Sequence, residues 1–508
     1  MKSIGYSIAS PLLFVCLLSA AATAAPPSWG GYARDGQHTA LSNVASQPIN
    51  RILWHTPVDL RPQYSGSDLL IHYGSALITG ANTIIVPVKT GTLEGFRVEA
   101  RRAADGVRIW KRSSDYKLPP HDWTPSFAPT ISALGKLWYP GGGGTVWSRT
   151  NPDGRLGAKT QRWAFYGSSA YRAHRRVYRQ NVFINTPLSS DGAGTVYFGF
   201  QVIGATPVNL SSGIARLTDA GIGSWVSAAT AAGDPAITKV AHNSAPALSL
   251  DGSKLYVAVS QGDGLGSAPG YLLELDSTSL ATVNKVRLTD PASGLDAALH
   301  DDGTASPTVG PDGDVYFGVL ENPFPSHNDR GWLLHFDAAL NPKPFAGSFG
   351  WDDTASIVPS TMVPSYSGVS TYLLMTKYNN YAGIGGDGVN RLAVLDPNDS
   401  MLDAISGATV MKEILTVAGV TPDPEFTPTF PNAVREWCIN TAAVDPIGKA
   451  VLANSEDGKL YRWDMASGTL AQTLVLTPGL GEAYTPTLIG PDGAVYAINN
   501  GTLFAVGQ

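Results

Sequence analysis

The sequence predicts an all-β protein: an eight-bladed β-propeller of four-stranded antiparallel blades, whose ring is closed by the N-terminal strand. Three observations lead to this fold class. A strand–turn–strand unit recurs along the 508 residues, apolar residues alternate at period two within the predicted strands, and the last unit lacks one strand that a spare segment near the start supplies.

The recurring unit is clearest at Thr304–Leu320, TASPTVGPDGDVYFGVL. Pro-Asp-Gly within it supplies a tight turn, because proline presets φ, aspartate caps the neighbouring backbone and glycine accepts a left-handed conformation. Thr485–Asn499 nearly repeats the unit, and Ser244–Val259 and Asn185–Phe200 are variants of it. Repetition at this spacing predicts a ring or array of similar sheets.

Each repeat contains four strands, which we name A to D from the inside of the predicted ring outward. Strands of the type GYLLELD (Gly270–Asp276) and GKLYRWD (Gly458–Asp464) are C strands. The repeats are about 45 to 80 residues long, within or somewhat above the periods of propeller blades. The sixth unit carries an extra segment around Thr421–Ala433. The eight A–B pairs begin near Ser75, Ala128, Thr186, Ala245, Ser306, Ile357, Thr441 and Thr485.

The ends of the chain predict how the ring closes. After Gly501–Gly507 the chain stops without a D strand, whereas Arg51–Val58 is a spare strand with D character. We expect this strand to complete the last blade, because closure removes exposed strand edges. The alternative is a loose N-terminal arm. The expected organisation is a signal peptide over 1–24, an N-terminal arm over 25–50 and one propeller domain over 51–508.

The first 24 residues have the pattern of a secretory signal peptide. Lys2 precedes an apolar run from Pro11 to Leu18, and Ala22-Thr23-Ala24 forms an A-x-A cleavage site. We therefore expect a secreted or periplasmic protein. The mature chain keeps only Cys438, so it has no internal disulfide, and no later segment is apolar enough to cross a bilayer.

The charge balance argues against a nucleic-acid partner. Asp and Glu number 41 against 35 Lys and Arg, and phosphate binding needs clustered basic residues. We expect a monomer that binds a protein or carbohydrate ligand.

The mature start, WGGYARDGQHTALSN (Trp29–Asn43), followed by a strand with Trp54, resembles the opening of pyrroloquinoline-quinone-type (PQQ-like) propellers. The resemblance implies eight four-stranded blades. It leaves the activity open, because that superfamily includes quinoprotein alcohol dehydrogenases and non-enzymatic scaffold proteins. PQQ and Ca²⁺ are the cofactors it suggests. Such dehydrogenases typically carry a disulfide between adjacent cysteines, which this chain lacks, although members without that disulfide keep the activity open.

The loops that connect strand D of one blade to strand A of the next (D–A loops) carry the candidate site. In a propeller they converge around the mouth of the central channel, and here they are polar in every unit. Clustered carboxylates of this kind raise one another's pKa or bind a cation such as Ca²⁺. The alternative is that these residues cap turns. The polar candidates are His121, Asp122, His242, His300, Asp302, Asp353, Glu436 and Glu482, of which Asp302, Asp353 and Glu482 are the metal candidates.

Aromatic and basic residues accompany these loops. Trp351, Trp437 and Tyr484 suit a sugar ring, a quinone or a protein side chain, or else pack between blades. Arg175 lies in an arginine-rich loop, Ser168–Asn181, that suits a carboxylate-bearing ligand or is simply solvated.

Two functions follow from these observations. The first is an exported binding or scaffold propeller that holds a protein or glycan on its loop-rich face. The alternative is a quinone-dependent oxidoreductase or a carbohydrate-active enzyme that uses the acidic channel mouth. The sequence does not decide whether the protein is an enzyme, although it contains no G-x-S-x-G, H-E-x-x-H or C-x-x-C-H motif.

Overall fold

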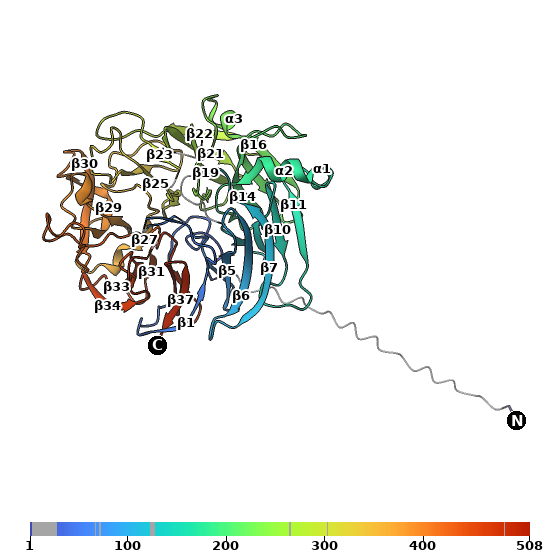
Figure 1. Cartoon of the computed structure of the whole chain (residues 1–508), viewed down its shortest axis with the longest axis horizontal. Coiled ribbons are helices and arrows are strands. Elements are labelled where there is room, and N and C mark those ends of the chain that lie inside the picture. The colour runs from blue at the N-terminus through green and yellow to red at the C-terminus, as the bar shows by residue number, and fades with distance from the viewer. Residues whose placement is uncertain are drawn as a thin grey trace.

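A computed structural model of the chain describes residues 1–2 and 28–508, apart from residues 67, 71–72, 122–126, 264–265, 302 and 482. It confirms the predicted eight-bladed β-propeller: eight small antiparallel sheets stand around a central axis (Figure 1). The A–B pairs begin within a few residues of the predicted positions. The predicted signal peptide lies almost wholly outside the described residues and stays a prediction.

The first four blades follow the chain in order from inner to outer strand. In blades 3 and 4 the inner strand is split into two short pieces that pair with the same B strand. The blades are β4 (Leu77–Ile78), β5 (Thr83–Lys89), β6 (Glu94–Arg102) and β7 (Arg108–Lys117); β8 (Thr130–Ile131), β9 (Leu137–Pro140), β10 (Thr145–Arg149) and β11 (Thr160–Ala164); β12 (Val182–Ile184) with β13 (Ser189–Ser190), β14 (Val196–Val202), β15 (Gly213–Leu217) and β16 (Gly223–Ser227); and β17 (Lys239–Val240) with β18 (Ala247–Leu248), β19 (Lys254–Ser260), β21 (Gly270–Asp276) and β22 (Thr282–Arg287).

Blade 5 departs from the expected four regular strands. Its outer position is occupied by a segment that pairs with β26 only through the isolated bridges Leu333↔Gly347 and Phe336↔Pro342. Blades 5 to 8 are β24 (Thr308–Val309), β25 (Val315–Val319) and β26 (Trp332–Phe336); β27 (Ser356–Pro359), β28 (Tyr372–Tyr378), β29 (Arg391–Leu402) and β30 (Thr409–Ala418); β31 (Ala443–Asp445), β32 (Ala450–Asn454), β33 (Lys459–Asp464) and β34 (Thr469–Val475); and β35 (Leu488–Ile489), β36 (Val495–Asn499), β37 (Thr502–Gly507) and β1 (Arg51–Pro57).

The remaining elements are short and belong to the connections. Two small pairs, β2 with β3 and β20 with β23, lie in loops. The described helices are α1 to α3 and the 3₁₀ turns η1 and η2, and none of them is long and apolar enough to span a membrane. Their bounds are β2 (Tyr64–Ser65), β3 (Asp68–Leu69), β20 (Ser267–Ala268), β23 (Leu299–His300), α1 (Ser168–Ala173), α2 (Arg175–Asn181), α3 (Ala228–Ala232), η1 (Ser360–Met362) and η2 (Ala382–Ile384).

Burial explains the composition of each strand position. Every residue of the B strands β25 and β36 is buried, because each blade packs between two neighbours, so these strands are apolar on both faces. The outer strand β34, TLAQTLV, alternates exposed and half-buried residues along its length, as a half-covered strand does. The core is therefore a series of apolar layers between adjacent blades.

The predicted turn chemistry is present where strand A meets strand B. In blade 5 Gly313 has φ +92° and the Asp312 carboxylate accepts from the amide of Asp314 at 3.1 Å. Gly493, at the corresponding turn of blade 8, has φ +82°. Only glycine adopts this conformation without strain, which is why Asp-Gly recurs at these turns.

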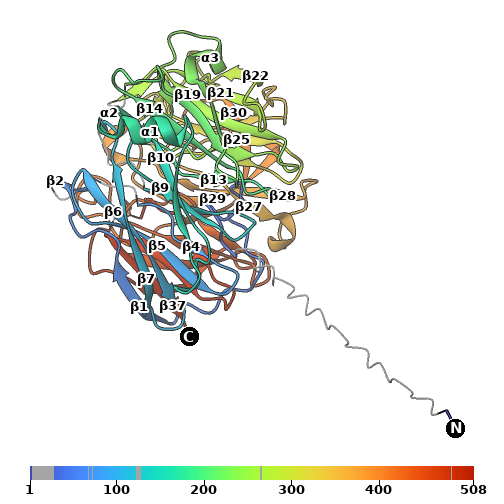
Figure 2. The same cartoon turned by 90° about the vertical axis from the view of Figure 1, so that its right-hand side faces the viewer.

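The N-terminal strand closes the ring as predicted. β1 pairs antiparallel with β37 from Arg51↔Gly507 to Pro57↔Thr502, and the two strands lie side by side in both views (Figures 1 and 2). The Trp54 indole donates to the carbonyl of Ala103 at 2.6 Å, which also anchors the strand to blade 1. The edge of β37 is thereby covered.

The segment before β1 is not loose, which the sequence did not predict. It runs around the end of the channel that bears the A–B turns, where its carbonyls accept hydrogen bonds from the inner strands of six blades. We call residues 28–50 the arm and this end of the ring the turn face. The N···O distances are 2.9 Å for Ile78 to Trp29, 2.6 Å for Ile131 to Gly30, 2.7 Å for Leu248 to Gly36, 2.9 Å for Val309 to Gln37, 3.0 Å for Ile357 to Thr39 and 2.9 Å for Val444 to Ala40.

One arm side chain reaches into the channel. The Tyr32 hydroxyl lies 2.6 Å from Asn440 Oδ1, 2.9 Å from Thr354 Oγ1 and 3.1 Å from the carbonyl of Thr304. Burial raises the pKa of Tyr32 to about 12. The ring of His38 packs edge-on against Tyr32, with 5.1 Å between ring centroids. The arm thus plugs the channel from the turn face.

Two truncations separate the plug from the closing strand. Removing 28–59 takes away β1 and leaves the edge of β37 open, so we expect insoluble protein or loss of a cooperative melt. Removing only residues 28–47 keeps β1, so we expect the protein to stay soluble but to melt at a lower Tm. Light scattering and calorimetry distinguish the two outcomes. A 28–59 deletion that melts like the parent would refute the closure.

Candidate functional site

The end of the ring opposite the turn face bears the B–C and D–A loops, and we call it the loop face. The D–A loops that carry the polar candidates of the sequence belong to this face. Three of these, Asp122, Asp302 and Glu482, lie outside the described residues, so two of the three predicted metal ligands stay untested predictions.

The histidines at the mouth are held in fixed hydrogen bonds. His242 is 2% exposed, and its Nε2 donates to the carbonyl of Pro120 at 3.1 Å while Nδ1 accepts from the Asn185 amide at 3.0 Å. Burial lowers the pKa of His242 well below its ordinary value, and the nearby Lys239 lowers it further. His121 is half-buried, and its Nδ1 donates to the carbonyl of Pro119 at 2.7 Å. The His242 ring is therefore a neutral positioning element between blades.

Blades 4, 5 and 6 contribute a second set of residues. Buried Lys239, at the start of β17, forms an ion pair with buried Asp301. The ring of His300 packs edge-on against Trp351, with centroids 5.7 Å apart. Asp352 accepts from both the amide and the hydroxyl of Thr304, at 2.7 and 2.6 Å. The cavity that His242, His300, Trp351 and their neighbours line measures about 20 Å³, which is room for little more than one water molecule.

The predicted candidate Asp353 lies in a third set, beside a buried lysine. Its carboxylate accepts from the Thr376 hydroxyl, and Asp353 is 1% exposed. Burial raises the pKa of Asp353 to about 7, although Lys377 and Thr376 oppose the rise. Burial alone would lower the pKa of Lys377, but Asp352 and Asp353 raise it above its ordinary value. Lys377 Nζ lies 3.5 Å from Asp352 and 5.2 Å from the centre of the Tyr484 ring.

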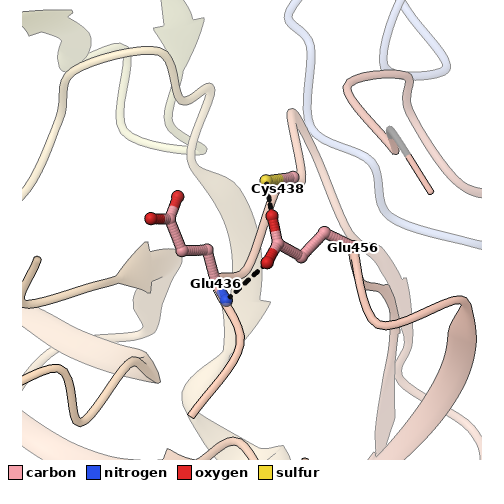
Figure 3. A group of neighbouring side chains, drawn as sticks. All are labelled: Glu436, Cys438 and Glu456. Atoms are coloured by element: carbon pink, nitrogen blue, oxygen red, sulfur yellow. Dashed lines mark hydrogen bonds between the residues drawn. The ribbon is translucent and has the colours of Figure 1, made fainter. Parts of the chain in front are cut away.

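Glu436 belongs to a group that the sequence did not reveal. Glu436, Cys438 and Glu456 each offer a ligand atom within 4.8 Å of the others. Figure 3 shows that the Cys438 thiol and the backbone amide of Glu436 both point at the Glu456 carboxylate, at 3.2 and 3.3 Å, while the Glu436 carboxylate is directed away. Burial raises the pKa of Glu456, and the Cys438 thiol opposes this rise. Nothing in the sequence indicated this group, because Cys438 stands alone and its acidic neighbour Glu456 lies in the turn between β32 and β33.

The remaining candidates are Trp437 and Arg175. Trp437 is 1% exposed and packs edge-on against Tyr461 in the core, so it supports the loop from behind. Arg175 is exposed, and its segment forms two short helices, α1 and α2, rather than the predicted loop. α1 packs against the outer strand β11 of blade 2, and α2 contacts the inner strand β12 of blade 3 (Figure 1). The arginine-rich segment therefore runs from the outer strand of one blade to the inner strand of the next.

The extra segment of the sixth unit borders a cavity on the loop face. Its two ends pair with each other, because the amide of Arg435 donates to the carbonyl of Thr421 at 2.9 Å. Arg435 also lies 3.2 Å from Asp423 and 3.9 Å from Glu456. A cavity of about 360 Å³ opens between this segment and the loop that follows β34. Its lining combines Pro422, Pro424, Pro478, Val475 and Leu480 with Arg435, Asp457 and Lys459.

Neighbouring loops brace this region. The Asn328 side chain of blade 5 donates to Asn380 of blade 6 at 3.2 Å, and the amide of Val434 donates to the carbonyl of Gly388 at 2.9 Å. The loops of blades 5, 6 and 7 are therefore joined into one surface before any ligand arrives.

The sequence matches no family model and no curated protein sequence. Its fold is that of solved eight-bladed propellers. A europium-containing methanol dehydrogenase matches with a TM-score of 0.53 and 10% identity, over 93% of this chain and 89% of that one. A quinohemoprotein alcohol dehydrogenase from Comamonas testosteroni matches with a TM-score of 0.54 and 12% identity, over 96% and 82%. Sqt1 of Saccharomyces cerevisiae matches with a TM-score of 0.51 and 9% identity, over 92% and 100%.

The described mouth does not fit PQQ, the cofactor that the resemblance suggests. This planar quinone carries three carboxylates, so it needs a flat slot and cations that are free to bind it. The described cavity beside His300 and Trp351 measures only about 20 Å³, and the buried Lys239 and Lys377 are already paired with Asp301 and Asp352. The likeness to quinoprotein dehydrogenases is thus one of fold.

The raised pKa of Asp353 predicts a pH dependence of stability. A carboxyl with a pKa of about 7 when folded and 3.8 when unfolded takes up a proton on folding, so its contribution weakens as pH rises from 4 to 7. Asp353→Asn removes this effect. We expect the Tm of the variant minus that of the parent to increase by about 2 °C or more across this range, measured by calorimetry.

Asp399→Asn is the matched control, because Lys412 holds the pKa of exposed Asp399 below its ordinary value. The stabilisation from Asp399 is lost as pH falls. The Tm of this variant minus that of the parent is therefore not expected to increase as pH rises. Equal slopes in the two variants would contradict a raised pKa at Asp353.

Proposed function

We propose that the protein is an exported binding propeller that holds a protein ligand on its loop face. The observation that carries this proposal is the cavity of about 360 Å³ between the 421–435 segment and the loop after β34, which lies within the size range of ligand sites. The signal-peptide pattern of the first 24 residues supports export.

The lining of this cavity favours a protein over a glycan. Prolines, Val475 and Leu480 form its apolar part, and Leu480 is 46% exposed. Arg435, Asp457 and Lys459 add charge of both signs. An apolar centre with a charged edge is typical of protein interfaces. No aromatic face, on which a sugar ring would stack, occurs among the described lining residues.

The charged residues of the loop face also support binding over catalysis. The buried lysines of the described mouth form ion pairs, and Arg435 joins Asp423 to Glu456 across two loops. Pairs of this kind fix loop positions, and a surface ordered in advance loses less entropy when it binds.

Site-specific crosslinking tests the proposal. A photoreactive amino acid at Leu480, incorporated in the native host, is expected to form discrete protein adducts in the exported fraction. Val369, which is 90% exposed on the turn face, is the matched control position and is expected to form several-fold less adduct. Equal labelling at both positions would contradict a binding site at the loop face, and a glycan-array signal without protein adducts would assign the site to glycans.

A thermal-shift experiment tests the oxidoreductase alternative. We expect Ca²⁺ with PQQ to leave the Tm unchanged relative to a chelator, because the described mouth has no slot for the quinone. A ligand at 100 times its Kd stabilises a protein by about 2.7 kcal/mol, which a melting curve resolves. A rise in Tm that depends on the PQQ concentration would instead support a quinone-dependent oxidoreductase.

A further inference from the structure

On the turn face, the inner strand of one blade differs from those of the other seven at a single position. In six blades the residue that donates its amide to the arm is isoleucine, leucine or valine, and blade 8 has Ile489 at the corresponding position. Blade 3 has Ser190, which pairs with Val196 just as Ile131 pairs with Leu137 in blade 2. The six donors are Ile78, Ile131, Leu248, Val309, Ile357 and Val444. The apolar pattern of the ring is therefore broken at one blade.

The arm passes this blade without pairing with it. Gly30 accepts from blade 2 and Gly36 from blade 4, and between them the arm folds back on itself through bonds between Arg34 and Gly30 and Gly31. Blade 8 is also not paired through Ile489, but the arm reaches that blade by Gln47, whose amide donates to Gly493 at 2.7 Å. Among the described hydrogen bonds no arm carbonyl accepts from the amide of Ser190. The channel-facing edge of β13 is thus open at the position where six other blades are covered by the arm.

A cavity of about 400 Å³ occupies this gap. Arm residues form one wall, and the A–B turns of blades 2, 3 and 4 form the others. Ser189 and Ser190 of β13 both line it. Ser189 is 4% exposed, and its hydroxyl has no hydrogen-bond partner among the described residues. A buried hydroxyl without a partner is unfavourable unless a ligand supplies one.

The charges that line the cavity select the occupant. Three carboxylates, those of Asp35, Asp191 and Asp251, line it against the single guanidinium of Arg34. Arg34 lies 3.1 Å from Asp35, so it neutralises only one of the three. The excess negative charge favours a cationic group.

We propose that this cavity binds an extended peptide segment that carries a lysine or arginine side chain. A carbonyl of the peptide accepts from the amide of Ser190, as arm carbonyls do in six other blades, and the basic side chain lies among the carboxylates. This is strand addition at an open inner edge. The site lies on the turn face, so it is independent of the ligand proposed for the loop face.

The test uses the mature protein, labelled with deuterium and ¹⁵N, and two pools of acetylated, amidated hexapeptides. One pool has lysine or arginine at the third position and the other has glutamate, with the remaining positions randomised. We expect the basic pool to shift the Ser190 amide resonance saturably and the glutamate pool to leave it unshifted. Equal shifts from both pools, or none from the basic pool, would overturn the proposal. A shift caused only by maltooligosaccharides would assign the cavity to sugars and also overturn it.

Ser190→Ile is the decisive variant, because it restores the residue type of the other blades and fills the gap. We expect it to abolish the response to the basic pool while the Tm stays equal or rises. Ser365→Ile, at an exposed serine on the same face, is the matched control and is expected to bind like the parent. Asp251→Asn keeps the backbone edge but removes one carboxylate, and we expect several-fold weaker binding. Undiminished binding in Ser190→Ile would refute the site.

Discussion

The inward-facing amides of the inner strands impose the constraint on which this structure depends. Eight short strands surround a narrow channel, and a buried amide without a partner is strongly unfavourable. In this chain the arm satisfies six of these amides with its own carbonyls. To do so it adopts left-handed backbone at non-glycine residues such as Ala33 (φ 43°) and Arg34 (φ 85°). The hydrogen bonds to the ring hold these conformations in place.

This arrangement makes the two ends of the ring structurally different. The arm and Tyr32 block the channel from the turn face, so a ligand reaches the polar mouth only from the loop face. At the mouth the described charges pair with one another, as Lys239 does with Asp301 and Lys377 with Asp352. The open space lies farther out, beside the 421–435 segment, and at the gap above β13. The two proposed binding sites therefore lie where the repeat pattern is interrupted, by an insertion on one face and by a serine on the other.

The repeat made the fold predictable, and non-local contacts limited the prediction of the site. Turn residues such as Asp312 and Gly313 act locally, so the sequence alone located the blades, and the missing last strand identified Arg51–Val58 as its partner. Lys377 was overlooked, although a lysine within the apolar strand LLMTKY is a detectable signal. The grouping of Cys438 with Glu456 and the route of the arm depend on which segments meet in space. The repeat pattern of the sequence contains no information about these contacts between distant segments.

The pairing of Arg51 with Gly507 also constrains how the protein reaches its native state. β1 is synthesised well before its partner β37, and seven blades lie between the two strands in the sequence. Contacts between residues so distant in sequence form late, because closing so large a loop is entropically unfavourable before the intervening blades have formed. Until the eighth blade has formed, β1 is therefore unpaired, with an apolar strand edge that invites association with other chains. The same strand that makes the finished ring continuous therefore leaves an open edge on the partly folded chain until β37 has been made.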